Sequence, residues 1–133
     1  MEPITKFELS KEYLELLQTG IAEENTAYIT DSLEGVNVAD IAAILDELQT
    51  DESLYVLRLL DPQLAADILI ELYDTTLQKV LQELETKEIA SWIALMDSDD
   101  GADILSYFTE KDREEVIAEI EDRIKLEQIL ELL

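Results

Sequence analysis

Apolar residues recur every twelve positions along most of this chain. The first series, here called the leucine column, consists of Leu33, Leu45, Leu57, Leu69, Leu81, Ile93, Leu105, Ile117 and Ile129. A second column, three positions later, consists of Val36, Leu48, Leu60, Leu72, Leu84, Met96, Phe108, Ile120 and Leu132. A third column, one position earlier than the first, consists of Ile44, Val56, Ile68, Val80, Trp92, Ile104 and Val116. Spacings of one and three positions place the three columns on one side of an α-helix.

The period itself indicates many short helices rather than one long helix. A continuous helix turns about 100° per residue, so a twelve-residue period would rotate the apolar stripe by about 120° at every repeat. No single face of such a helix could be buried, and the helix must therefore end once per repeat. Subtracting a turn leaves about eight or nine residues per helix, which is too short to be stable in isolation. We expect an all-α, right-handed α-solenoid whose short helices are stabilised by packing on their neighbours.

Polar residues interrupt the apolar pattern once per repeat, where the helices should begin. These interruptions fall at residues 49–51, 61–62, 73–75, 85–86, 97–98 and 108–109. Each contains an Asp, Ser or Thr whose side chain can accept a hydrogen bond from a free amide of the next helix. Pro62 suits a first helical turn, where no amide donor is needed, and Thr109 with Asp112 resembles a capping box.

The chain is expected to form a single domain over residues 1–133. Residues 1–20 are predicted to be an acidic lead-in segment and one helix over residues 11–18, ended by Gly20. Residues 21–110 carry the short-helix repeats, with a looser junction at residues 35–37. Residues 110–133 show no convincing break and are predicted to form one longer helix. Its uncovered apolar end suggests that the natural polypeptide continues into further domains.

The composition removes several classes of function. Without any cysteine or histidine the chain has no disulfide, no thiolate nucleophile, and neither the commonest general base nor the commonest transition-metal ligand. We predict that the protein is not an enzyme. No apolar run approaches the length needed to cross a bilayer, so this part of the polypeptide should not insert into a membrane.

The charge is strongly negative, with 33 acidic against 9 basic residues and a formal net charge of −24. Such a field repels nucleic acid and anionic lipid, and attracts cations or a basic partner. Because the excess also opposes compaction through self-repulsion, divalent cations should stabilise the fold.

Three repeat units carry a resemblance to a known family. Residues 38–48 read VADIAAILDEL, residues 59–69 read LLDPQLAADIL, and residues 96–105 read MDSDDGADIL. In this order, and over residues 21–124, the repeats resemble the cytoplasmic N-terminal domain of the MgtE family of magnesium transporters.

The resemblance implies a regulatory role on the cytoplasmic side of the cell membrane, within a multi-pass membrane protein. The domain would dock on adjacent CBS domains of the same polypeptide, below a transmembrane pore, in a full-length homodimer. Mg²⁺ held between acidic faces would favour the closed pore, and loss of Mg²⁺ would let those faces separate. Regulatory and membrane domains would follow residue 133, so conduction is not expected of this chain.

The resemblance also selects candidate Mg²⁺ ligands. The metal-facing acids of the family fall on Asp67, Asp99 and Asp103, and Asp100 in the same motif completes the set. Asp99 and Asp103 are four residues apart and so share a helix face, where like charges cost stability unless a cation joins them. The alternative is structural: Asp99 and Asp100 would belong to a helix start capped by Ser98, and Asp67 would be an ordinary exposed acid.

Two other functions compete with the transporter hypothesis. An acidic helical-repeat scaffold could bind a basic partner protein, as the middle domain of the flagellar motor switch binds its neighbours. A nucleic-acid mimic that sequesters a basic protein would have this charge, but it is not expected to have repeats. A calcium-binding loop starting at Asp97 is excluded, because its glycine falls at the fifth position and Phe108 stands where the twelfth requires Glu.

Overall fold

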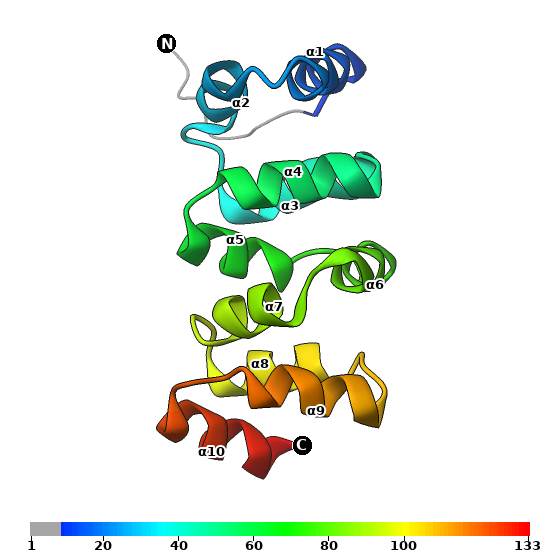
Figure 1. The fold of residues 1–133 in the computed structure, drawn as a ribbon. Coiled ribbons are helices and arrows are strands. Elements are labelled where there is room, and N and C mark those ends of the chain that lie inside the picture. Colours follow the sequence, from blue (N-terminus) through cyan, green and yellow to red (C-terminus); the bar gives the residue numbers. More distant parts are fainter. Residues whose placement is uncertain (1–8) are drawn as a thin grey trace.

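Every regular element in the described part of the chain is an α-helix. The computed structural model describes residues 9–133, which contain ten helices of eight to twelve residues. They are α1 (Lys11–Ala22), α2 (Thr26–Leu33), α3 (Val38–Glu47), α4 (Thr50–Leu59), α5 (Pro62–Leu69), α6 (Asp74–Glu83), α7 (Thr86–Ile93), α8 (Ser98–Leu105), α9 (Glu110–Ala118) and α10 (Arg123–Leu132). Figure 1 shows them stacked in successive layers, with α1 and α2 at one end and α10 at the other. The prediction of an all-α repeat of short helices is confirmed; most of the predicted lead-in, residues 1–8, lies outside the described residues.

The apolar columns form the core of this stack. The leucine column is buried from Leu33 to Leu105 and again at Ile129, and every member of the third column is buried. The second column lies nearer the edge of the core, where Leu72 and Leu84 remain 7% and 8% exposed. Burying one Leu or Ile side chain contributes about 1.5–3 kcal/mol, so the columns supply the main stabilising force for helices this short.

Most helices begin where the polar interruptions predict. The Asp61 carboxylate accepts a 3.1 Å hydrogen bond from the Gln63 amide, and Pro62 is the first residue of α5. The Thr109 hydroxyl accepts a hydrogen bond of 3.3 Å from the Asp112 amide at the start of α9. Two further helices, α4 and α7, begin with reciprocal capping boxes. Each cap satisfies amide groups that lack a partner inside the helix.

Alternate helices pack on one another through the stack. The contacts run from α3 to α5, from α5 to α7 and from α7 to α9, while α4 packs on α6 and α8 packs on α10. Each short helix is therefore held by its neighbours in space, and the core is continuous from one end of the stack to the other.

The C-terminal segment is two helices, and the prediction of one longer helix over residues 110–133 is wrong. α9 ends at Ala118, and α10 begins at Arg123 after the Asp122 carboxylate accepts a 3.0 Å hydrogen bond from the Lys125 amide. The turn brings α10 against α8 and buries Ile129 completely. A straight helix would have left that side chain in water.

Gly20 does not end the first helix, which continues to Ala22. A Cβ atom at Gly20 would lie 2.9 Å from Cδ2 of Tyr28, so the glycine permits a close approach of α1 and α2. The left-handed residue that follows the helix is Glu24, with a φ of 53°. Gly35, with a φ of 78°, does occupy the predicted loose junction between α2 and α3.

Within residues 9–133, no helix combines the length and the apolar character that a membrane span requires.

Candidate cation-binding face

The start of α8 gathers acidic side chains. Asp97 is the N-cap residue, yet its carboxylate accepts no capping hydrogen bond. Ser98 is the first helical residue, and its hydroxyl donates a 2.8 Å hydrogen bond to the Gln128 side chain of α10. The alternative in which Ser98 caps α8 is therefore wrong. No ion pair is formed by the acids of this turn within residues 9–133.

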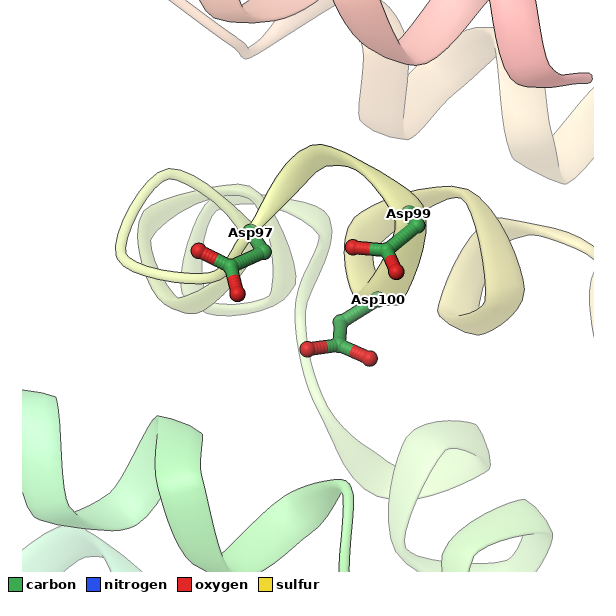
Figure 2. A group of neighbouring side chains, drawn as sticks. All are labelled: Asp97, Asp99 and Asp100. Atoms are coloured by element: carbon green, nitrogen blue, oxygen red, sulfur yellow. The ribbon is translucent and has the colours of Figure 1, made fainter.

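Three carboxylates converge at this turn. One oxygen each from Asp97, Asp99 and Asp100 lies within 4.8 Å of the others, and no other group of three acids in residues 9–133 is gathered as closely as this. Figure 2 shows Asp97 in the turn before α8, with Asp99 and Asp100 in the first turn of the helix. Asp97 and Asp99 are exposed and Asp100 is half-buried, so the group is open to solvent on one side.

The electrostatic environment of this group is negative. Partial burial raises the pKa of the Asp100 carboxyl above its ordinary value, and the charges of Asp99, Asp97, Asp103 and Glu71 raise it further. The N-terminus of α8 favours acids through its helix dipole. Burial, together with repulsion from the neighbouring acids, outweighs that attraction at Asp100, because the net shift of its pKa is upward.

Asp99, Asp100 and Asp103, three of the four predicted ligands, lie on α8. Asp99 and Asp100 belong to the three-carboxylate group. Asp103 lies one turn further along α8, is exposed, and contributes to the negative field at Asp100. Asp99 and Asp103, four residues apart on α8, thus both add to the negative charge around Asp100.

Asp67 is not a member of the three-carboxylate group and lies on another helix, α5. Its Oδ1 accepts a 3.0 Å hydrogen bond from Nε2 of Gln63, and the same nitrogen donates to the Leu95 carbonyl at 3.1 Å. Gln63 thus ties α5 to the turn after α7 and also bonds Asp67, which is half-buried rather than an ordinary exposed acid.

Sequence reasoning missed two acids, Asp97 and Glu71. The sequence pattern places Asp97 at a helix break and in a rejected calcium loop, although its position in the acidic run 97–100 is a visible signal. Glu71 lies in the turn after α5, and nothing in the sequence pattern indicates that its charge acts on Asp100.

Positive charge compensates little of this surface. Residues 9–133 contain one ion pair, between Arg58 and Glu88. It joins α4 to α7 through two 2.9 Å hydrogen bonds. The hydrogen bond from Arg58 is the main cause that lowers the pKa of Glu88. Lys125 of α10 donates to the Met96 carbonyl just before the acidic turn, without an ion pair to its carboxylates.

The donor set of the acidic turn suits a hard divalent cation. Mg²⁺ and Ca²⁺ take oxygen ligands, and Mg²⁺ commonly uses one or two carboxylates and retains several waters. Softer transition metals prefer imidazole or thiolate, which this chain does not contain. The residues present therefore fit a partly hydrated Mg²⁺ ion.

Replacing Asp100 with asparagine is expected to raise the free energy of unfolding near pH 7 by roughly 0.2–0.5 kcal/mol. The pKa of Asp100 is raised in the folded state, so its charged form opposes folding. This cost appears as the pH rises through the raised pKa and is absent below the ordinary value of 3.8. Urea denaturation should show the gain near pH 7 and none at about pH 3.

Asp40→Asn provides a matched control. Asp40 is the third residue of α3, as Asp100 is of α8, and it is also half-buried but outside the acidic group. Removing the charge of Asp40 should slightly destabilise the fold, because the helix dipole favours an isolated acid in the first turn. Equal responses of the two variants would show that repulsion at the acidic turn is negligible.

The fold and the acidic turn together define a helical-repeat domain with a cation-attracting face. Residues 36–133 match the model of the family described as the MgtE intracellular N domain. This match covers most of the chain, and the chain therefore belongs to that family.

Known structures agree with this assignment at the level of the fold. A crystal structure of the soluble part of a magnesium transporter is similar to this chain with a TM-score of 0.78 and 16% sequence identity. The similarity covers 92% of this chain and 48% of the other, so this chain spans about half the length of that structure. A search of curated proteins gives no significant match.

Proposed function

We propose that this domain senses Mg²⁺ and regulates a magnesium transporter from the cytoplasmic side of the membrane, as one part of a longer multi-pass polypeptide. Membership of the MgtE intracellular N domain family supports this function. The fold also matches a structure whose title names it the soluble part of a magnesium transporter.

The observation that carries the proposal is the acidic turn at the start of α8. Three carboxylate oxygens lie within 4.8 Å of one another there, and the surrounding charges on Asp100 are all negative. The carboxylates of such a group repel one another, and a divalent ion bound between them offsets that repulsion. A surface that needs a cation for its stability can report the concentration of that cation.

The mechanism follows from bringing two like-charged surfaces together. In our proposal the acidic turn faces an acidic surface of adjacent CBS domains in the same polypeptide, which forms a homodimer. The two surfaces approach when Mg²⁺ lies between them, because their repulsion is then offset by shared coordination. At low Mg²⁺ the surfaces repel, the domain separates, and the pore is released from its closed state.

We assign Asp97, Asp99 and Asp100 as the primary Mg²⁺-facing residues, with Asp103 supporting them through its charge. These residues share α8 or the turn before it. Asp67 remains a proposed ligand on a second element, α5, where its second carboxylate oxygen is available beside the one bonded to Gln63. One Mg²⁺ needs few carboxylates, so the two elements would serve different ions or an ion shared with the partner surface.

Transport by the full-length polypeptide tests this function. The triple variant Asp97→Asn, Asp99→Asn, Asp100→Asn should keep conducting at internal Mg²⁺ concentrations that close the wild type, because the domain no longer has the carboxylates that coordinate the bridging ion. A control with the same charge change is Glu12→Gln, Glu15→Gln, Glu23→Gln, on or beside α1 at the opposite end of the stack. Closure of the Asp triple variant at the wild-type Mg²⁺ concentration would refute the proposed sensor.

A further inference from the structure

A groove lies between α6, the start of α7, and α9. Its volume is about 370 Å³, within the size range of ligand and side-chain pockets. The floor is apolar and is formed by Leu81, Leu84, Ile89, Phe108 and Val116. The groove shares no residue with the acidic turn of α8.

The groove forms where α6 and α9 do not pack closely on each other. The main helix contact of α6 is with α4, whereas α9 packs against α7, so α6 and α9 flank the groove without packing closely on each other. Tyr107 lines the groove, and its hydroxyl donates a 2.7 Å hydrogen bond to Asp74 at the start of α6. This bond fixes the turn before α9 against α6, so the groove is formed before anything binds.

The rim of the groove is polar and acidic. It carries the amides Gln78 and Gln82 on α6 and the carboxylates Asp112 and Glu115 on α9, with no lysine or arginine among the lining residues. Both carboxylates are exposed, and neither forms an ion pair within the described residues. An apolar floor beside two uncompensated acids favours an occupant with an apolar face and adjacent positive charge.

We propose that this groove is a docking site for a cationic amphipathic helix of a partner protein. Large apolar side chains of that helix would fill the groove above Leu81 and Val116, and its lysine or arginine residues would lie against Asp112 and Glu115. This is the helix-in-groove mode, in which apolar anchors at positions i, i+3, i+4 and i+7 enter a preformed groove.

A second copy of this chain fits the groove poorly. Each copy carries a net charge of −24, and their mutual repulsion opposes association at a rim that is itself acidic. The partner is therefore distinguished by its positive charge as well as by its apolar face.

Binding of a designed peptide to the complete 133-residue chain tests this proposal. The probe is an amphipathic peptide of about 15 residues made of leucine and lysine. Its control has the same lysines with every leucine replaced by serine. Calorimetry should show binding of the first peptide and at least tenfold weaker binding of the second, because the groove takes apolar anchors. Amide chemical shifts should change on α6, α9 and the turn before α9.

A matched pair of variants separates the groove from the general negative field. Glu115 lines the groove, whereas its neighbour Glu114 is an exposed acid of α9 that does not. Glu115→Lys should weaken binding of the leucine–lysine peptide about fivefold, and Glu114→Lys less than about twofold, at equal ionic strength.

Three outcomes would overturn the proposal: equal weakening by Glu114→Lys and Glu115→Lys, chemical-shift changes spread over the whole acidic surface, or equal binding of the serine–lysine peptide. Self-association of the chain that Glu115→Lys changes, without peptide binding, would instead assign the groove to a second copy.

Discussion

Replacing Ile93 with alanine is expected to lower the free energy of unfolding by about 2–5 kcal/mol. Ile93 belongs to the leucine column at the end of α7 and is 0% exposed. α7 packs on both α5 and α9, so the cavity would open in the middle of the stack, where neighbours on either side restrict collapse. Denaturant unfolding with a fixed m-value would measure the loss.

Ile124→Ala is the matched control for Ile93→Ala. Ile124 lies on α10 and is 71% exposed, so removing the same atoms should change stability by less than about 0.5 kcal/mol. Similar losses from the two substitutions would mean that the leucine column does not form the core.

Replacing Gly101 with alanine is the second large effect, a loss of about 1–3 kcal/mol. A Cβ atom at Gly101 would lie 3.0 Å from Cγ2 of Ile93 and 3.2 Å from Cδ1 of Ile129. Both isoleucines are 0% exposed and have little room to move. The clash therefore outweighs the gain of about 1 kcal/mol that alanine has over glycine inside a helix. Thermal or denaturant unfolding would measure the net change.

Two further variants identify the clash as the cause. Gly101→Ala should cost less in the Ile93→Ala background, because that substitution removes Cγ2, and a double-mutant cycle would show the coupling. Gly20→Ala should be tolerated, since the ring of Tyr28 that it approaches is 36% exposed and can rotate away. Additive losses at positions 93 and 101 would contradict a direct contact between them.

The sequence was sufficient to predict the repeat, because one physical requirement determines it. A twelve-residue period leaves no continuous face to bury, so the chain must form short stacked helices, and the buried columns follow. The caps at Asp61 and Thr109 could be predicted for the same reason, since each helix start needs an acceptor for its free amides.

The misplaced helix ends have specific causes. The twelve-residue period itself predicts a break near Asp122, but the helix-favouring residues over 110–133 predict a continuous helix. The break is stabilised by the packing of Ile129 on α8, which the local sequence does not indicate. Glycine often ends helices, so the sequence predicts a helix end at Gly20, whereas in the structure Gly20 permits the close approach of Tyr28. Local propensity cannot distinguish these two uses of glycine.

The candidate site was only partly predictable. Asp99 and Asp100 are adjacent in the sequence, and their proximity follows from a single helical turn. The contribution of Glu71 to the field at Asp100 depends on how the helices between them stack, which no sequence spacing expresses. The separation of Asp67 from the acidic turn has the same origin, since it depends on packing between helices.

The most direct test of Mg²⁺ sensing is the thermal unfolding of this domain against MgCl₂, with NaCl at matched ionic strength. At about ten times its dissociation constant, Mg²⁺ should stabilise the fold by roughly 1.4 kcal/mol, which raises the unfolding midpoint by several degrees. The triple variant Asp97→Asn, Asp99→Asn, Asp100→Asn should lose this response, whereas the Glu12, Glu15, Glu23 control should retain it. An equal effect of NaCl, or an unchanged response in the Asp triple variant, would contradict Mg²⁺ binding at the acidic turn.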